Sequence, residues 1–437
     1  MKKIGHIIYF EYKALLRNNI LKLLVLTILG VSLYGIYFGQ NEVSKQAARI
    51  QQVQAFERQQ FDSLLHWVSL DTTIAENKDK FQRAISPVGV GWDKHFTYYV
   101  KNDPPVLAGL CIGQRDLFPV YYGFNVTSLQ KQIYISELAN PMKLLTGNFD
   151  LAYVFVFLFP LLVIALFYNL YANEQEGGTL PLLRAQATSL STVLFSKGLA
   201  RFLFLTGITG VVLLLGFVLQ GISLTTQATQ LGQWFWSITL YNFLWILMVS
   251  LIVAFKRGST LSAMLGLGLW LFFVLITPAF INISLKAAEP LPMRAKVIHT
   301  MRTTNDHFWE SPKSTVIKAF NAKYPQYTVS DTTNFNQWYY ASFTLIDEKA
   351  AEINAQFEAQ VAKRNKVLDR YLWLAPAALM HEYLSGVAKT DRDSYLGFLE
   401  EVKAFHQQLK AIYYPKIYAN EQFTVRDLER LKAELAH

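Results

Sequence analysis

The sequence predicts an all-α polytopic membrane protein, on the basis of its composition and of five long apolar runs. Hydrophobic residues make up 52% of the 437 residues and charged residues only 17%, against about 25% charged in an average soluble domain. The apolar residues are concentrated in the five runs, and the stretches between them are ordinarily polar. Such clustering is typical of membrane-spanning helices and argues against an ordinary soluble enzyme.

Each run is close to the roughly 20 residues that a helix needs to cross the hydrocarbon core of a bilayer. Pro160 and Pro278 fall inside two of the runs, where neighbouring helices can satisfy the carbonyl groups that a proline leaves free. The predicted spans are residues 20–38, 151–171, 202–219, 235–254 and 261–283.

Basic residues in the short connections predict how the spans are oriented. Positive charges precede or open the first span, and others lie in the connection between the second and third spans and in the connection between the fourth and fifth. In that order they are Lys2, Lys3, Lys13, Arg17 and Lys22; Arg184, Lys197 and Arg201; and Lys256 and Arg257. By the positive-inside rule these three segments belong in the cytoplasm. The net charge of +9 is spread along the chain and forms no basic face, so nucleic acid is not an expected partner.

The orientation predicts a simple division of the chain. Residues 1–19 form a cytoplasmic amphipathic helix, 20–38 the first span, and 39–150 a first external domain. Residues 151–283 form a four-span bundle with a cytoplasmic linker at 172–200, and 284–437 form a second external domain. Helix-period segments at 41–68, 341–371 and 394–413 predict that both external regions are mainly helical.

The sequence contains no signature of a nucleotide or metal site. A phosphate-binding loop would need a glycine-rich turn that ends in Gly-Lys-Ser/Thr, and none is present. Gly266 and Gly268 lie in a predicted span, where small residues let helices pack closely. The eight histidines have no H-x-x-x-H spacing, and the single cysteine, Cys111, is expected to be a small buried apolar residue. No enzymatic activity, metal or cofactor is expected in this chain.

The most informative segment follows the second predicted span. It reads NEQEGGTL from Asn173 to Leu180, then PLLRAQ, with Ser196-Lys197-Gly198 further on. Two carboxylates, a glycine pair and a threonine before an apolar stretch predict that one helix ends here and a second short helix begins. On composition alone, a solvated loop is an equally good interpretation.

This segment resembles the permeases of ABC type-2 exporters, whose second span commonly ends in Glu-x-x-x-Gly-Thr-Leu-x-Leu-Leu with a later Lys-Gly or Lys-x-Leu. The residues that fit are Glu174, Gly178, Thr179, Leu180, Leu182, Leu183 and Lys197. More narrowly, the chain resembles a subfamily with large extracytoplasmic insertions after the first and fifth spans. The further matches are Glu137-Leu138-Ala139-Asn140-Pro141, then Gly147, Asn148, Phe149 and Asp150 at the start of the second span, Leu374-Ala375-Pro376-Ala377, Thr390-Asp391-Arg392, Phe398, Phe405 and His406.

The resemblance implies the permease subunit of an ATP-driven exporter in the bacterial inner membrane, with a cytoplasmic N-terminus. Two such subunits, identical or paralogous, would pair, and two separate ATPase subunits would bind ATP and Mg. The helix at 1–19 would act as an elbow, and the helix at 180–187 as a coupling element. The residues that the resemblance assigns to ATPase contact are Glu174, Glu176, Gly178, Thr179, Leu180, Leu183 and Arg184.

Members of this family end in a sixth span, and residues 1–437 contain no sixth apolar run. We expect such a span beyond His437; the alternative is a protein with five spans and an external C-terminus. A different function is also compatible with the sequence, namely a mechanotransmitting or membrane-anchored assembly or sensor protein whose external domains act on a periplasmic partner without transport. The spans contain no charge pair that would identify a substrate.

Overall fold

The computed structural model describes residues 2–92, 96–127, 129–130, 133, 148–185, 189–256, 258–290, 294–327, 329 and 334–435. Within these residues the protein is helical apart from one two-stranded sheet, which confirms the predicted all-α class. Five helical segments are long and apolar enough to cross a membrane, and each contains or closely overlaps one predicted span: Asn19–Val68, Leu151–Glu176, Leu190–Leu219, Ala228–Ala254 and Ser259–Ala288.

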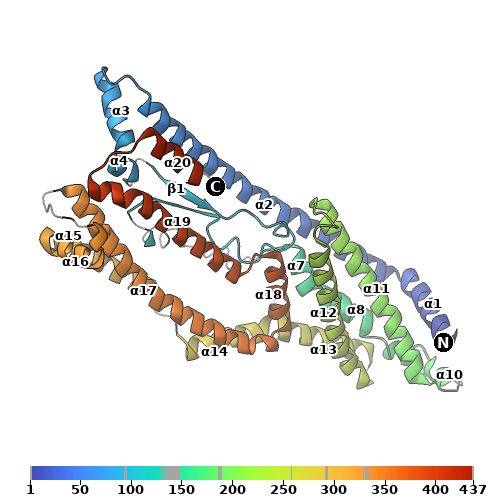
Figure 1. Cartoon of the computed structure of the whole chain (residues 1–437). Helices are drawn as coiled ribbons and strands as arrows, with labels where there is room; N and C mark the ends of the chain where they lie inside the picture. The colour runs from blue at the N-terminus through green and yellow to red at the C-terminus, as the bar shows by residue number, and fades with distance from the viewer. Residues whose placement is uncertain are drawn as a thin grey trace.

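The chain begins with two helices, α1 (Lys2–Arg17) and α2 (Asn19–Val68). Asn18 caps α2, because its side chain accepts the backbone N–H groups of Ile20 and Leu21 at 3.0 and 3.2 Å. α2 has 50 residues and is therefore about 75 Å long at a rise of about 1.5 Å per residue. The first span and the polar helix predicted after it are thus one continuous helix that runs along most of the molecule (Figure 1).

The second to fifth spans form a bundle, and the second span lies at its centre. That span consists of α7 (Leu151–Tyr153), the π-helix η1 (Val154–Leu158) and α8 (Phe159–Phe167). α9 (Ala172–Glu176) and α10 (Leu180–Ala185) follow it, and then come α11 (Leu190–Leu219) and α12 (Ala228–Ala254). The fifth span is built from α13 (Ser259–Leu271), the π-helix η2 (Phe272–Ile276) and α14 (Thr277–Ala288). The most apolar window of the second span is 67% buried and that of the fifth only 17%, so the second span is central.

The proline in the second span is accommodated by its neighbours, as the sequence predicts. Pro160 has no N–H group to donate to Val156 four residues earlier. The Tyr241 hydroxyl donates to Val156 O at 2.8 Å, and Trp270 Nε1 donates to Phe157 O at 2.9 Å. These carbonyls lie in η1, and π-helical turns are frequent at functional sites within helices.

The two segments predicted to be external, which we call the external part after that prediction, contain most of the remaining elements. The first segment supplies α3 (Ala75–Ile85), α4 (Pro87–Gly91), and an antiparallel pair of strands, β1 (Tyr98–Lys101) and β2 (Tyr121–Phe124). The second supplies α15 (Arg294–Glu310), α16 (Lys313–Lys323), η3 (Pro325–Tyr327), α17 (Phe335–Tyr371), η4 (Leu372–Leu374), α18 (Pro376–Ala388), α19 (Arg392–Ala419) and α20 (Val425–Leu435).

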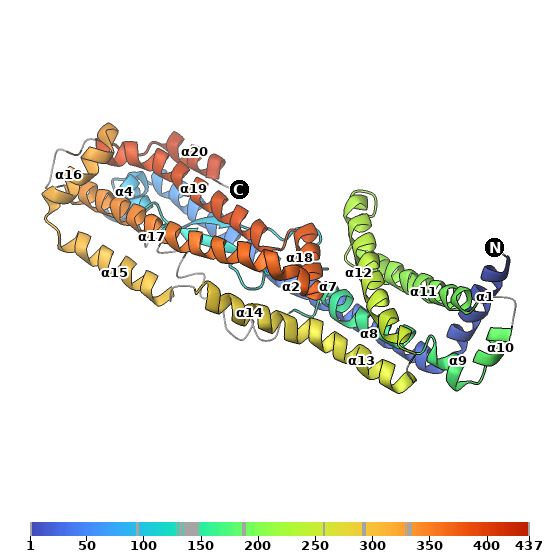
Figure 2. The same cartoon turned by 90° about the horizontal axis from the view of Figure 1, so that it is seen from below.

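These two chain segments share one hydrophobic core. Phe61 and Tyr98 from the first segment pack in the same cluster as Phe320 and Tyr413 from the second. The backbone N–H of Phe423 also donates to Ile85 O at 2.7 Å. The external part is therefore one body built from both segments, which we call the external body, and it lies at one end of an elongated molecule (Figure 2).

The external body also reaches into the core of the bundle. Ala377, Met380 and Leu384 of α18 and Leu107 and Leu110 of the β1–β2 connection are buried in the cluster that contains the second span. Cys111 is buried there too, which confirms the expectation for this residue. Its Sγ lies 3.3 Å from Ser385 Oγ.

Candidate coupling site at the two ends of the second span

The second span ends, on the side of α1, in a buried network of ion pairs. Glu174 of α9 is only 7% exposed. The Lys197 ammonium of α11 donates to Glu174 Oε1, and the Thr179 hydroxyl donates to Oε2. Lys197 Nζ also lies 3.7 Å from Oε2 of Glu11, which belongs to α1. Three elements that are separate in the sequence therefore meet at one lysine.

Arg201, one helical turn after Lys197, extends the network. Its Nε and Nη2 both lie 2.7 Å from Glu11 Oε1, and its Nη1 donates to Leu166 O and, at 3.0 Å, to Asn169 Oδ1. Glu11 and Arg201 are each 7% exposed. Because a buried charge is stable only when it is paired and hydrogen-bonded, each member fixes the position of the others. The network joins α1, the end of the second span and the third span.

The chain turns sharply after α9. Gly178 has a φ of +70°, a conformation that favours glycine. The N–H of Thr179 donates to Glu174 O at 3.1 Å and that of Gly178 to Gln175 O at 3.3 Å. This pair of bonds is the Schellman motif that ends many helices. The helix end and the second short helix predicted at this point are both present.

Glu176 connects the same turn to the fifth span. Its carboxylate accepts the backbone N–H of Ser259 at 2.8 Å and the Ser259 hydroxyl at 2.9 Å. Ser259 is the first residue of α13, and a carboxylate is favourable at a helix N-terminus. The segment 172–185, which we call the linker, is therefore bonded to α11 and α13, and Lys197 connects it to Glu11 of α1.

The exposed residues of the linker lie mainly in the turn at 175–179 and on α10. Leu180 is 8% exposed, whereas Leu182 is 66% exposed; Arg184 is exposed and Leu183 half-buried. Phe195, near the start of α11, is also 66% exposed. Leu182 and Phe195 were not among the residues assigned to ATPase contact, because a sequence motif does not show which of three neighbouring leucines faces outward. The α11 helix begins at Leu190, so the last third of the predicted linker 172–200 belongs to it.

The predicted contact residues thus fall into two groups. Glu174, Gly178 and Thr179 form the turn and its network, and the Leu180 side chain is buried beneath it. Glu176 holds the fifth span, while Leu183 and Arg184 are accessible. Direct ATPase contact by any of them stays a prediction, and the buried Glu174 carboxylate faces inward. Ala187, the predicted end of the coupling helix, lies outside the described residues. Arg257, one of the basic residues used to predict the orientation, lies outside them too.

The opposite end of the second span begins at another buried carboxylate. Asp150 is fully buried; its Oδ1 accepts the N–H of Tyr153 at 2.8 Å, and its Oδ2 accepts the N–H of Ile112 at 2.8 Å. Burial raises the pKa of this carboxyl above its ordinary value. Asn148 Nδ2 donates to Gly113 O at 3.2 Å, and the Phe149 ring lies 5.5 Å from the ring of Tyr34. Gly147 and residues 137–141 lie outside the described residues.

Backbone segments approach one another very closely around Asp150. A Cβ atom added at Gly39 of α2 would lie 1.9 Å from Gly109 O, and one at Gly35 would lie 3.0 Å from Asp150 O. Gly113 has a φ of +56° and a Cβ there would lie 2.7 Å from Thr390 O. We call this region, residues 107–115 with 148–153 and 385–391, the joint. It permits no side chain at these glycines.

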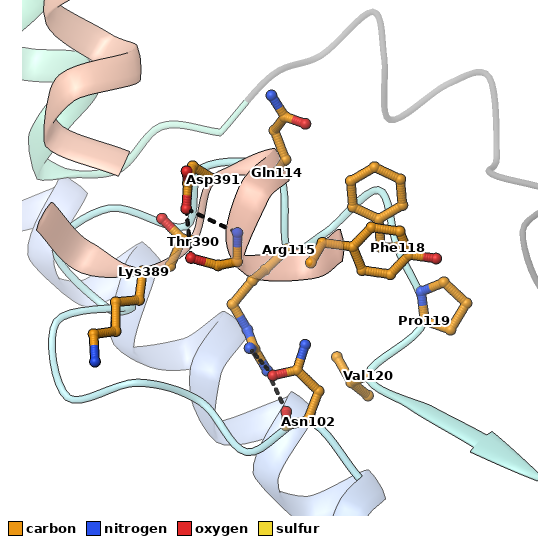
Figure 3. A pocket seen from close by; sticks show the side chains of 11 residues that line it. Asn102, Gln114, Arg115, Phe118, Pro119, Val120, Lys389, Thr390 and Asp391 are labelled. Carbon is orange, nitrogen blue, oxygen red and sulfur yellow. Dashed lines mark hydrogen bonds between the residues drawn. The ribbon is translucent and has the colours of Figure 1, made fainter. Parts of the chain in front are cut away.

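Arg115 fastens the joint to α2 and, beside the small cavity drawn in Figure 3, to Asn102. Its Nε donates to Gln46 Oε1 at 3.0 Å, and its Nη1 and Nη2 donate to Oδ1 and O of Asn102 at 2.9 and 2.5 Å. Burial lowers the pKa of Arg115 to about 10. The cavity beside it, which Phe118, Thr390 and Asp391 also line, has a volume of about 20 Å³, enough for a single water molecule. The joint is therefore a mechanical connection and not a substrate pocket.

The two glycines predicted for helix packing lie on different faces of α13. A Cβ atom at Gly266 would lie 2.9 Å from Ile164 Cγ2 of the second span, whereas nothing lies within 4 Å of that position at Gly268. Gly268 therefore packs against no helix among the described residues, unlike the prediction for it. In the described part of the chain, no group of three or more His, Cys, Asp and Glu side chains is placed to hold a metal ion.

Comparisons with known proteins give limited matches. Residues 294–433 match a family model described as a domain of unknown function, DUF3526. The chain is 29% identical over 134 residues to the probable ABC transporter permease protein NosY of Stutzerimonas stutzeri, covering 29% of this chain and 48% of that protein. The chain thus spans about half the length of the curated relative it matches, and no solved structure matches it. Part of this membrane protein is similar to an ABC transporter permease.

Proposed function

We propose that this chain is the membrane-spanning permease subunit of an ATP-driven ABC transporter. Its N-terminus would lie in the cytoplasm of a bacterial cell and its spans in the inner membrane. The similarity to NosY and the five apolar helices support this assignment. The single observation that carries it is the linker, which is bonded to α11 and α13, is connected to α1 through Lys197, and exposes Leu182 and Arg184 at its surface.

A separate ATPase subunit, which would bind ATP and Mg, would dock on α10. Leu182 offers an apolar side chain that is 66% exposed, and Arg184 offers a charge beside it. The core of a protein interface is more apolar than its rim, and arginine is enriched there relative to the rest of the surface. Two permease subunits and two ATPase subunits would form the complete transporter.

The contacts of the linker suggest how movement would spread from the ATPase. A displacement of α10 pulls on Glu174 and hence on Lys197 of the third span, and it pulls on Glu176 and hence on Ser259 of the fifth. α1 follows because Glu11 is bonded to Arg201. Three parts of the membrane region would therefore move together when the ATPase subunits close, and export of a substrate is the outcome we favour.

A second candidate function is mechanical work on a periplasmic partner, with no substrate crossing the bilayer. The observation that favours it is the continuity of α2, which begins with the first span and contributes Phe61 and Leu64 to the core of the external body. A tilt of the first span would move the external body directly. Spin labels at Asp71→Cys, in the exposed connection after α2, would report this movement in a reconstituted pair of permease subunits. A label distance that changes during ATP turnover favours this candidate, and an unchanged distance opposes it.

The permease assignment is tested by reconstituting the chain with an ABC ATPase subunit that co-purifies with it. We expect vanadate-sensitive ATP hydrolysis that depends on the permease. Leu182→Glu should reduce both the assembly of the complex and this stimulation at least tenfold, since a charge would be placed at the centre of the interface. Leu224→Glu, which changes an exposed leucine in the α11–α12 connection, is the matched control and should have no effect. Equal activity of both variants with the unchanged protein would refute the proposed docking site.

A further inference from the structure

The end of α17, together with η4 and α18, exposes an unusual set of large side chains. Trp373 is 68% exposed, Tyr371 51%, Leu379 46% and Tyr383 45%. These residues lie within a stretch of thirteen positions that includes the turn between two helices. We call residues 370–383 the foot of the external body.

The position of the foot relative to the spans follows from its contacts. On its other face, α18 buries Ala377, Met380 and Leu384 in the core of the bundle. It contacts α12 and both π-helical turns, η1 and η2, and the His381 ring lies 6.3 Å from the ring of Phe157 in η1. η1 begins three residues after the start of the second span. The foot therefore lies beside the start of the second span, where the bundle meets the external body (Figure 1).

The exposed apolar surface of the fifth span lies next to the foot. α14 lies beside α17, and Lys363 forms an ion pair of 2.8 Å with Glu289 at the end of α14. Phe280 and Ile283 of α14 are 67% and 68% exposed. α17 runs back toward the bundle while α14 leaves it, so α14 lies alongside α17, which ends at Tyr371 (Figure 2).

The charges near the foot complement an anionic surface. Residues 363–383 contain four basic side chains, Lys363, Arg364, Lys366 and Arg370, and two acidic ones, Asp369 and Glu382. Lys366 and Arg370 are exposed and lie within two turns of Tyr371. Trp and Tyr are enriched where a protein crosses the headgroup region, and nearby Lys and Arg side chains bind lipid phosphates.

We propose that the foot binds anionic phospholipid headgroups of the membrane leaflet that faces the external body. Trp373 and Tyr371 insert their rings among the headgroups, while Lys366 and Arg370 contact phosphates above them. This contact holds the external body on the bilayer beside α18, which packs against both π-helical turns of the spans. The inference depends on the membrane location of the chain and not on the docking of an ATPase.

The chain allows a direct measurement of the depth of the foot. Its single cysteine is fully buried, so an added cysteine is the accessible one for labelling. We would attach a nitroxide at Trp373→Cys in the full chain, reconstitute it in vesicles of phosphatidylcholine with phosphatidylglycerol, and compare collisions with oxygen and with a water-soluble nickel chelate. The label at position 373 should show an oxygen-to-nickel ratio several-fold higher than a label at Asp71→Cys, the exposed control site.

Two results would overturn the proposal. One is a label at position 373 that is as accessible to nickel as the label at position 71. The other is protection from oxygen and nickel together, with spin–spin broadening, which would show that a second copy of the chain covers the foot. Both results would leave the proposed docking of an ATPase untouched, because that proposal is tested by ATP hydrolysis.

The preference for anionic lipid is tested by charge reversal. At low salt the ratio at position 373 should be higher in vesicles with phosphatidylglycerol than in phosphatidylcholine alone, and the difference should shrink as salt is added. Lys366→Glu with Arg370→Glu should abolish the difference, since each basic residue contributes roughly fivefold to binding of an anionic surface. Lys318→Glu with Arg426→Glu, exposed residues of α16 and α20, is the charge-matched control and should retain it. An unchanged lipid preference in the Lys366 and Arg370 variant would refute the headgroup assignment.

Discussion

The second span is bounded by two buried carboxylates that are held in different ways. Asp150, at the side of the external body, accepts two backbone N–H groups, those of Ile112 and Tyr153. Glu174, at the side of α1, accepts from two side chains, the Lys197 ammonium and the Thr179 hydroxyl. One end of the same helix is therefore fixed to the backbone of the external body, and the other is fixed by groups that can rotate.

The difference indicates where the molecule can change shape. At the joint, Gly39 and Gly113 let backbones touch, and close-packed contacts of this kind move only as a unit. In the network, Lys197 lies between two carboxylates, Glu174 and Glu11, and a small shift of α10 would change its partner. We therefore expect rearrangement at the linker and rigid transmission at the joint.

The largest effect is expected from a side chain added at the joint. In Gly39→Ala the new Cβ would lie 1.9 Å from Gly109 O, so α2 and the β1–β2 connection must separate. Overpacking of this kind costs about 3 kcal/mol or more, and we expect a large fall in the thermal unfolding midpoint of the purified chain. Gly30→Ala is the control on the same helix, since nothing lies within 4 Å of its Cβ position. It should be neutral or slightly stabilising, because alanine is the better helix former. Similar midpoints for the two variants would show that the joint is not rigid.

A somewhat smaller effect is expected when the backbone-bound carboxylate is removed. Asp150→Ala loses the cap of the second span, worth about 1 kcal/mol, and leaves the Ile112 N–H buried without its acceptor, which costs about 1 to 3 kcal/mol. Asn148→Ala removes one partly buried bond to Gly113 O and should cost less than 1 kcal/mol. The comparison is made by denaturant or thermal unfolding in one detergent. If Asn148→Ala were as destabilising as Asp150→Ala, the buried carboxylate would not be what secures this end.

As pH falls, the external body should lose stability before the ion-pair network at Glu174 does. His406 is fully buried between Phe124 and the pair formed by Lys410 and Asp347, and burial lowers its pKa from 6.5 to about 3. Between these two pH values the unfolded chain binds a proton that the folded chain does not, so stability falls as pH falls below 6.5. The loss is roughly 1.4 kcal/mol per pH unit.

The measurement is the unfolding midpoint of the unchanged protein and of His406→Gln between pH 7.5 and 4.5. Glutamine does not titrate, so the gap between the two proteins should narrow as pH falls, while carboxylates common to both cancel. Parallel pH profiles would show that His406 does not contribute to the acid sensitivity.

Much of the architecture follows from sequence pattern, because apolar runs of about 20 residues and helix-period segments are local signals. The five spans, α17 and α19 were predicted in this way, as were the helix end and turn at Gly177 and Gly178. The common core of the external body could not be predicted, since Phe61 and Tyr413 are brought together by contacts more than 300 positions apart. The strands β1 and β2 were missed because each has only four residues.

In the candidate site, too, the contacts between residues distant in the sequence could not be predicted. The motif contained both Glu174 and Lys197, but it did not show that these two side chains, 23 positions apart on different helices, are paired. Glu11 and Arg201 carried no signal of their own, because a charge near a predicted span is usually solvated. Their pairing depends on how α1 packs against α11, which only the folded structure defines.

The smallest expected effect on stability concerns the network itself. A double-mutant cycle on Glu174→Gln and Lys197→Gln should give a coupling energy of about 1 kcal/mol. This energy is modest because Lys197 keeps 19% of its side-chain surface exposed to screening.

The effect of these substitutions on function should be larger. Each single variant should still assemble with the ATPase but lose most of the permease-dependent hydrolysis, since α10 is no longer attached to α11. Lys45→Gln, which breaks an exposed ion pair with Glu42 on α2, is the control and should leave hydrolysis unchanged. A measurable coupling energy with normal hydrolysis in both variants would make the network a structural clamp and would move the transmitting contact to Glu176 and Ser259.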